Sequence, residues 1–344
     1  MRIVEDLALV LSGGSYRAMF QIHCLVLLES LGIYPKTIYA ISGGVPNALG
    51  FMLGKASRLE KTWLGIKPGR LYKRDYWRLL VEPVKRGRWP ILGASSIFKT
   101  KELDKVIDRE VDFKAVLRSP VELQVAVADL ISGEILLFSN KTFGMTPEFF
   151  RAIVIGSMRI PVFWEPMIVL FEGREYQFVD AGLIVNLPVK KAVEDGFSKI
   201  IAIETTPRHL NAISKLETLA EADLRYGEIR HIDETNGHLK WIDFINRDIS
   251  VAENVEKFLD DARVPADIRE QVNKELKNFM FFEKRHVVTC RIAPPATLEV
   301  FQKNKKKDYG ASTLWSRSEL LGAGEAAAEL VLMPFLIEQG ILIL

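Results

Sequence analysis

The sequence predicts an α/β fold in which a mostly parallel central sheet is flanked by helices. Two observations lead to this prediction. A short apolar run, a glycine turn and a helical pattern follow one another twice within the first 55 residues, and further apolar runs return after residue 120. Strands that alternate with helices pair in parallel, because each helix carries the chain back along the sheet.

The two repeated units are defined by their apolar residues. In the first, residues 6–11 (DLALVL) predict a buried strand that enters a tight turn at Ser12-Gly13-Gly14. Helical spacing follows from Met19 onward, until Leu31-Gly32 ends it. In the second unit, residues 37–41 (TIYAI) predict another buried strand, and the turn Ser42-Gly43-Gly44 leads into another helix.

Later strands are predicted by six short apolar runs. The first four form two hairpins and the last two stand alone: 121–128 with 134–138, 167–171 with 175–179, then 199–203 and 287–292. An amphipathic helix is predicted over residues 318–340, interrupted at Pro334. We expect a single domain over residues 1–344, with helical insertions at about 56–118 and 208–284, the second placed to cap the functional site.

Charge and cysteine usage exclude several classes of protein. The 46 Lys and Arg residues almost balance the 44 Asp and Glu residues, so no nucleic-acid partner is indicated. Cys24 and Cys290 cannot make a disulfide framework, and an acidic pair stands near the N-terminus where a signal peptide would be apolar. The uncharged run 37–54 holds Ser42, Pro46 and four glycines, which predict a strand, a turn and a helix start rather than a membrane span. We expect a cytoplasmic protein of undetermined oligomeric state.

The second glycine turn has the composition of a nucleophile elbow. Ala40 and Gly44 stand two residues before and after Ser42, and residues this small let a strand reverse sharply into a helix with the hydroxyl in the open. The N-terminus of that helix would favour negative charge developing near the serine oxygen. A serine between glycines is on its own most often only a turn, so neighbouring motifs must decide.

The first glycine turn is a candidate anion cradle. The backbone N–H groups of Gly13, Gly14 and Ser15 lie at a helix N-terminus, and Arg17 adds a positive charge. Such a turn fits an oxyanion hole, a nucleotide phosphate site or a plain structural turn. The absence of a Walker lysine with its Ser/Thr, and an incomplete G-x-G-x-x-G pattern, weaken the nucleotide interpretation.

Several motifs together resemble those of the patatin-like phospholipase family. The segment LSGGSYRAMFQIHCL is similar to the family's glycine-rich oxyanion segment, YAISGGVPNALG to its nucleophile elbow, and FVDAGLIVNLPV to its aspartate segment. The segments AVADLISGEILLFSN and AIVIGSMRIPVFWEPM fit in the right order. The resemblance covers about residues 5–205, the strand at 286–294 and the C-terminal helix.

The resemblance implies a patatin-like three-layer sandwich and lipid acyl hydrolysis of the phospholipase A or lysophospholipase kind, without histidine, metal or cofactor. It makes Ser42 the nucleophile and Asp180 the general base of a Ser-Asp dyad that works through an acyl-enzyme. It also makes the N–H groups of Gly13, Gly14 and Ser15 the oxyanion hole, with Arg17 close by. A free aspartate has a pKa of about 3.9 and is a poor base at neutral pH, so we expect the Asp180 pocket to be partly desolvated.

Three residues depart from the family pattern. Ser15 stands at the usual third glycine of the first turn, Ala40 at the first glycine of the elbow, and Ala181 after Asp180 where glycine is usual. Ser15 matters most, because a non-glycine residue at positive φ costs roughly 1–2 kcal/mol and could tilt an oxyanion N–H. The departures keep a non-catalytic patatin-like protein, which binds lipid or a partner, as the first alternative.

Two further alternatives stay open. The first is a nucleotide-binding regulator that uses Gly13 and Gly14. The second is a Ser-Asp-His triad, since the order Ser42, Asp180, His286 matches that of α/β-hydrolases. Against the triad, Ser42 lies close behind the first glycine turn, and His286 fits a strand-edge residue better.

A basic and aromatic stretch runs from Lys67 to Arg88. It holds eight basic residues against two acidic ones, with Tyr72, Tyr76 and Trp77 between them. The stretch fits either a solvated helical insertion or a peripheral membrane patch, whose cations meet anionic head groups while its aromatic rings lie at the interface. No Cys, His or acidic cluster has metal-ligand spacing, so neither zinc nor calcium is expected.

Overall fold

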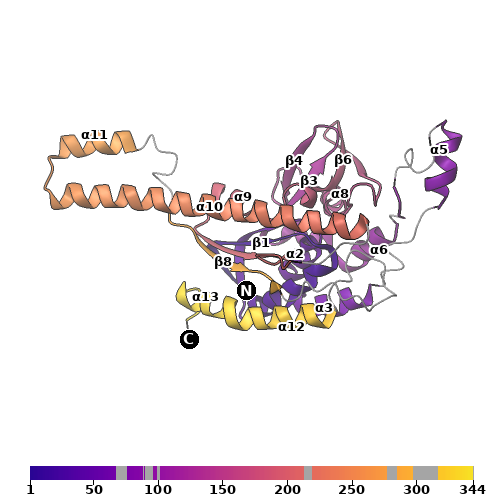
Figure 1. Ribbon diagram of the computed structural model, residues 1–344, viewed down its shortest axis with the longest axis horizontal. Helices are drawn as coiled ribbons and strands as arrows, with labels where there is room; N and C mark the ends of the chain where they lie inside the picture. The colour runs from indigo at the N-terminus through magenta and orange to yellow at the C-terminus, as the bar shows by residue number, and fades with distance from the viewer. Residues whose placement is uncertain are drawn as a thin grey trace.

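The computed structural model describes residues 1–66, 76–87, 89, 96–98, 101–212, 219–276, 285–296 and 317–343. Within these ranges the strands form one eight-stranded sheet in the order β5-β6-β3-β2-β1-β7-β8, with β4 paired to β3. Figure 1 shows the sheet at the centre of the molecule, with helices on both of its faces. The predicted α/β class is therefore confirmed.

The sheet combines a parallel core with an antiparallel end. The parallel strands are β1 (Arg2–Leu11), β2 (Ile33–Ala40), β3 (Glu122–Asp129), β7 (Lys199–Ile203) and β8 (Val288–Ile292). The antiparallel ones are β4 (Glu134–Ser139), β5 (Met167–Phe171) and β6 (Arg174–Asp180). Both predicted hairpins, β3–β4 and β5–β6, are present. β3 joins the two regions because β2 and β6 pair with successive parts of one of its edges, while β4 pairs with the opposite edge.

The helices fall into two layers and a set of surface segments. Their bounds are η1 (Ser15–Gln21), α1 (Ile22–Ser30), α2 (Gly44–Met52), α3 (Ala56–Gly65), η2 (Trp77–Val81), α5 (Glu82–Lys85), α6 (Lys101–Glu110), α7 (Phe113–Arg118), α8 (Pro147–Ser157), η3 (Ala181–Leu183), α9 (Val189–Glu194), α10 (Leu219–Asp261), α11 (Ala266–Leu276), α12 (Arg317–Ala327), η5 (Ala328–Leu332) and α13 (Met333–Glu338). In Figure 1, α10 and α12 run along opposite sides of the sheet.

Alternate residues of β1 pack against the two helical layers. Leu7, Leu9 and Leu11 belong to the cluster that includes α1, α2, α8 and α12, whereas Ala8 and Val10 belong to the cluster of α9 and α10. All five side chains are fully buried. This alternation follows from the two-residue period of a strand covered on both faces, and it gives the helix, sheet, helix layering of a three-layer sandwich.

The first unit differs in detail from the predicted helix. A 3-10 helix, η1, precedes α1, because the turn tightens to bring the N–H of Arg17 onto the carbonyl of Gly14 at 3.0 Å. The second unit follows the prediction, since residues 37–54 form the end of β2, a turn, α2 and its C-terminal turn. The uncharged run is thus divided between a strand and a helix.

The C-terminal helix is not interrupted at Pro334, contrary to the prediction. Helical structure is continuous from Arg317 to Glu338, and the π-helical η5 lies directly before α13, in whose first turn Pro334 stands. The wider π turn accommodates a proline that has no N–H to donate. By length and composition this one helix of the described residues is apolar enough to cross a membrane, with a mean hydropathy of 1.7, and 39% of that window is buried within the protein.

The two segments expected as insertions are mainly helical where the structure describes them. The first contributes α3, α6 and α7, and the second consists of α10 and α11. Ile242, Ile245 and Ile249 of α10 pack on the sheet. Beyond Ile249, no described residue of α10 or α11 is buried, and this part projects from the body in Figure 1.

Candidate active site

Ser42 occupies the sharp turn between β2 and α2. Its φ is 51°, in the left-handed region that L-residues rarely adopt, and it is only 6% exposed. The Ser42 N–H donates to Ser157 Oγ at 3.0 Å, and that hydroxyl donates to the carbonyl of Ala126 at 2.8 Å. A strained turn held from α8 and β3 gives the serine a fixed direction.

The glycines after Ser42 are required by close backbone packing. A Cβ at Gly43 would lie 2.7 Å from the carbonyl oxygen of Ser15, and one at Gly44 would lie 2.8 Å from that of Leu11. Both contacts are shorter than real Cβ atoms make, so only glycine fits. The two predicted glycine turns are therefore packed directly against each other.

Asp180, the last residue of β6, lies beside Ser42. It is 4% exposed, and its carboxylate accepts hydrogen bonds from the Ser42 hydroxyl and, at 2.7 Å, from the Gly182 N–H. Burial raises the pKa of Asp180 to about 6, although these two hydrogen bonds act in the opposite direction. Desolvation thus raises the pKa of this carboxyl group, in the direction expected for the aspartate segment.

Ala181 is accommodated without strain. Its side chain is fully buried in a small cluster with Ile41 and Val179, and its φ is not positive. Ala40 is also fully buried, at the end of β2. Neither departure from the family pattern distorts the turn in which it stands.

Ser15, in contrast, carries the strain that its position predicts. Its φ is 52°, and the preceding Gly14 has a φ of 153°. The N–H of Gly13 points to the carbonyl of Asn186 at 3.4 Å, and the carbonyl of Gly13 accepts a hydrogen bond from Thr205 Oγ1. The turn lies against Ser42, since a Cβ at Gly13 would be 3.0 Å from Ser42 Cβ.

The charge of Arg17 is neutralised by α10. Its guanidinium Nη1 donates to Glu228 Oε1 at 2.8 Å, and the two side chains are only 15% and 7% exposed. Arg17 lies close to the first glycine turn, as the resemblance implies. Its partner was not predicted, and the ion pair means that Arg17 does not present an uncompensated positive charge.

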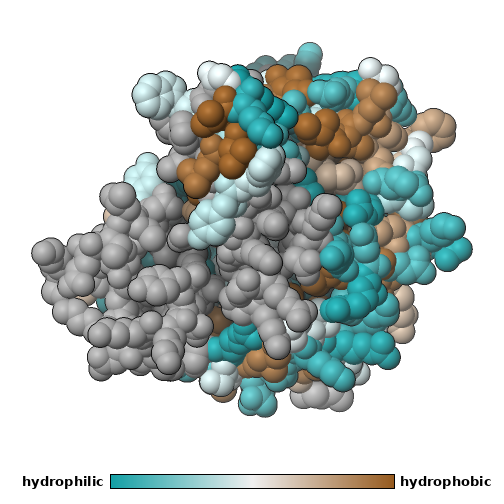
Figure 2. All heavy atoms as spheres, turned by 90° about the vertical axis from the view of Figure 1, so that its right-hand side faces the viewer, coloured by the Kyte–Doolittle hydropathy of each residue, from teal (hydrophilic) through white to brown (hydrophobic). Residues whose placement is uncertain are grey.

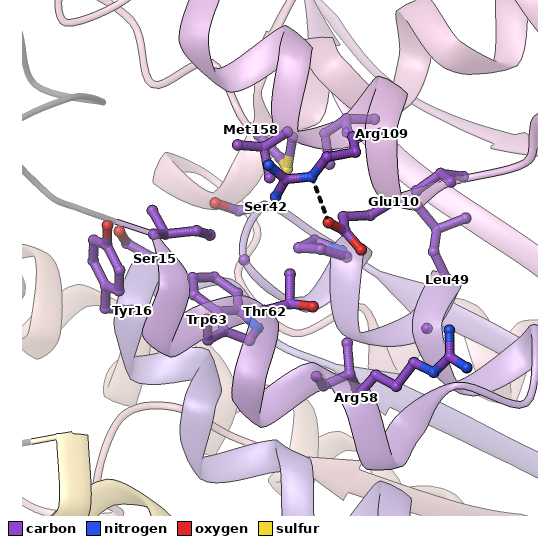
Figure 3. A pocket seen from close by; sticks show the side chains of 18 of the residues that line it. Ser15, Tyr16, Ser42, Leu49, Arg58, Thr62, Trp63, Arg109, Glu110 and Met158 are labelled. Carbon is purple, nitrogen blue, oxygen red and sulfur yellow. Dashed lines mark hydrogen bonds and ion pairs between the residues drawn. The ribbon is translucent and has the colours of Figure 1, made fainter.

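A mainly apolar pocket of about 250 Å³ opens at Ser42. It is enclosed by α2, α3, α6 and the segment after α8, with apolar lining residues Tyr16, Leu49, Leu53, Leu59, Trp63, Ile66, Val106, Ile107, Val111, Met158, Ile160 and Trp164. Figure 3 shows Ser42 at one side of the pocket, between side chains of α3 and α6. The first insertion therefore forms the pocket wall.

The charged residues of the pocket come from the same helices. Lys55 and Arg58 belong to the start of α3, and Arg109 and Glu110 to the end of α6, where Arg109 Nε donates to Glu110 Oε1 at 2.7 Å. Ion pairs hold α6 against α8 and the segment that follows α8. One of them joins Asp104 of α6 to Arg159 at 2.9 Å.

The second insertion contacts the site outside the pocket and does not cap the pocket. None of the pocket-lining residues comes from α10, which instead contacts the loops that carry the site. The prediction that residues 208–284 cap the site is therefore wrong for the part that the structure describes. The sequence gives no signal for this placement, because it depends on how distant surfaces pack.

The histidines do not complete a triad. His286 Nε2 pairs with Glu253 Oε2 at 3.0 Å, far along α10 from Asp180, and its side chain is 40% exposed. His231 was not singled out from the sequence, yet its Nε2 lies 2.8 Å from the carbonyl oxygen of Gly182. Among the described residues, no group of three or more His, Cys, Asp or Glu side chains could hold a metal ion.

Comparisons with known proteins complete this picture. Residues 9–193 match the model of the family described as patatin-like phospholipase, and this span contains Ser42, Asp180 and both glycine turns. A search of the curated proteins finds no significant match. The crystal structure of VipD from Legionella pneumophila is similar with a TM-score of 0.36 and 11% identity, over 96% of this chain and 66% of the VipD chain. Since the family model covers more than half of the sequence, the chain belongs to the patatin-like phospholipase family.

Proposed function

We propose that this protein is a serine lipid acyl hydrolase of the phospholipase A or lysophospholipase kind, with Ser42 as nucleophile and Asp180 as general base. The observation that carries the proposal is the hydrogen bond from the Ser42 hydroxyl to a buried carboxylate whose pKa is raised to about 6. A base with that pKa is largely ionised at neutral pH and accepts a proton more readily than an ordinary aspartate.

The proposed reaction has two stages. Asp180 takes the Ser42 proton as Oγ attacks the acyl carbonyl, and it returns the proton to the leaving alcohol when the acyl C–O bond breaks. Water, activated by the same carboxylate, then cleaves the acyl-enzyme. The N–H groups of Gly14 and Ser15 and the N-terminus of α2 are the candidates that stabilise the oxyanion.

The pocket supports a lipid acyl chain as the group transferred. Its apolar lining next to Ser42 suits a hydrocarbon chain, while Lys55, Arg58 and Thr62 supply polar groups for the rest of the substrate. A phospholipid or a lysophospholipid combines these two parts in one molecule, which favours them over short water-soluble esters.

The surface around η2 and α5 supports peripheral contact with a membrane. Tyr76, Trp77, Leu80, Val84 and Trp89 are exposed large apolar side chains. Lys85 Nζ lies 4.6 Å from the centre of the Trp77 ring. The view in Figure 2 faces the side from which α5 projects in Figure 1, and apolar side chains gather along its upper edge beside hydrophilic ones. Residues 67–75 and 88 of the predicted basic stretch lie outside the described residues.

We therefore propose action in the cytosol at an anionic membrane surface. Cosedimentation with phosphatidylserine vesicles tests the contact, with Trp77→Ser and Lys85→Gln expected to weaken binding severalfold. Ser57→Ala, at an exposed position of α3, is the matched control. Equal binding by all four proteins would remove the membrane part of the proposal.

The hydrolase is tested by release of fatty acid from lysophosphatidylcholine and phosphatidylcholine micelles. Wild-type protein is expected to release fatty acid, and Ser42→Ala to lose at least about a hundredfold in rate, with Ser57→Ala unchanged. The strained Ser15 in the oxyanion turn favours one alternative, a lipid-binding protein without catalysis. That alternative predicts lipid binding equal in wild type and Ser42→Ala, and no release by either.

A further inference from the structure

Helix α10 contacts two parts of the candidate active site, the 3-10 helix after the first glycine turn and the segment after Asp180, and it supplies none of the pocket-lining residues. Three of its residues, spaced three apart and so on neighbouring turns, reach different loop residues. Glu228 pairs with Arg17 at 2.8 Å, and His231 Nε2 lies 2.8 Å from the carbonyl oxygen of Gly182. Glu234 Oε2 accepts the backbone N–H of Asn186 at 3.1 Å.

The contact of His231 bears directly on Asp180. Gly182 donates its N–H to Asp180 Oδ1 at 2.7 Å, while its carbonyl is held by His231. Both polar groups of this one residue are thus fixed, one by the base and one by α10. Because a carbonyl can only accept, His231 Nε2 must carry the proton, and His231 Nδ1 is buried without a hydrogen-bond partner.

Glu234 is linked to the first glycine turn through Asn186. The Asn186 N–H donates to Glu234 Oε2, and the Asn186 carbonyl oxygen lies 3.4 Å from the Gly13 nitrogen. Glu234 Oε1 is buried without a hydrogen-bond partner, so this carboxylate accepts a hydrogen bond only at Oε2. Burial raises the pKa of Glu234 to about 7 and lowers that of His231 to about 4, which leaves His231 neutral near pH 7.

We propose that His231 and Glu234 are positioning residues for the reaction: His231 holds the Gly182 turn that orients Asp180, and Glu234 holds the backbone that faces Gly13. This inference rests on the proposed function. The helix itself is anchored independently, because Ile242, Ile245 and Ile249 pack it against the sheet. Loss of either polar contact should therefore disturb the site more than the fold.

The test is the pH profile of p-nitrophenyl ester hydrolysis by His231→Ala, His231→Gln, Glu234→Ala and Glu234→Gln. We expect kcat to fall about tenfold or more in both alanine variants with KM within about twofold, since the acyl pocket is untouched. His231→Gln keeps an N–H donor, and Glu234→Gln keeps an oxygen acceptor, so each should recover most of the loss.

A second readout separates positioning from general destabilisation. In His231→Ala the Gly182 N–H is held less firmly against Asp180, so the acidic limb of kcat/KM should move upward by about half a pH unit or more. Arg17 and Arg230 are the charged groups that act on His231, Glu228 is paired with Arg17, and all three are unchanged in this variant. Asp233→Ala, exposed on the same helix, controls for helix content.

The outcomes are distinguishable. An active wild type with unchanged kcat in His231→Ala and Glu234→Ala alike, and an unchanged acidic limb in His231→Ala, would overturn this inference and leave the hydrolase proposal standing. The inference would also be overturned if the losses in kcat followed the fall in melting temperature alone, so that Ile245→Ala gave the same loss of kcat at equal destabilisation. A wild type without any turnover would overturn both proposals together.

Discussion

The Ser42 hydroxyl donates a hydrogen bond to the Asp180 carboxylate across the junction between the parallel and antiparallel regions of the sheet. Strand β3 makes this pairing possible, because β2, which leads to Ser42, and β6, which ends at Asp180, pair with successive parts of the same edge of β3. Val125 and Val127 of β3 are in register with Ala40 and Asp180 respectively. Neighbouring strand ends thus bring together two residues far apart in the sequence.

The raised pKa of Asp180 predicts the pH dependence of activity. A general base must be ionised, so kcat/KM should be level above pH 7 and fall about tenfold per unit well below pH 6. The measurement is ester hydrolysis from pH 4.5 to 9. A profile whose acidic limb lies near pH 4 would mean that Asp180 is not desolvated in solution.

The same pKa predicts a stability effect of opposite sign to that of a salt-bridged aspartate. Burial raises the folded-state pKa from 3.8 to about 6, so the folded protein binds more protons and loses stability as the pH rises through that window. Asp180→Asn should therefore stabilise the protein at pH 8 by roughly 1–3 kcal/mol, and much less at pH 4. Urea denaturation at both pH values checks this. Asp243→Asn, exposed on α10, should show no such difference.

Ser15→Gly should stabilise the protein by about 1 kcal/mol, because glycine adopts a φ of 52° without the steric cost that serine incurs. The matched control is Ser57→Gly, within the exposed first turn of α3, which should lose about 0.5 kcal/mol. Thermal unfolding of both variants gives the comparison. Loss of stability in Ser15→Gly would show that the serine side chain makes a contact worth more than the strain.

Gly324 of α12 is predicted to be irreplaceable at the helix crossing. A Cβ there would collide with the carbonyl oxygen of Phe20, whereas one at Gly322 on the same helix meets nothing within 4 Å. Gly324→Ala should cost at least about 2 kcal/mol, and Gly322→Ala should gain about 0.5–1 kcal/mol. Chemical denaturation of the pair decides the point, and equal effects would contradict the close crossing of α12 over η1.

The sequence predicts the sheet and the two glycine turns at its strand ends, for local physical reasons. A glycine pair directly after an apolar run predicts a sharp turn from the local sequence alone. The positive φ of Ser15 follows from its place in such a turn. The partners of the site were not predictable in the same way. Arg17 meets Glu228, and Gly182 meets His231, only because α10 packs over residues distant in sequence. The π turn before Pro334 likewise depends on a helix held by tertiary contacts rather than by its own propensity.

The most direct test of the central claim is fluorophosphonate labelling of the purified protein, with Ser42→Ala and Asp180→Asn labelled in parallel and turnover of a short-chain p-nitrophenyl ester measured on the same samples. We predict labelling of Ser42 in the wild type, no labelling in Ser42→Ala, and turnover reduced at least about a thousandfold in Asp180→Asn. Equal labelling of wild type and Ser42→Ala, or a wild type that neither labels nor turns over with anionic vesicles present, would contradict the Ser42-Asp180 dyad.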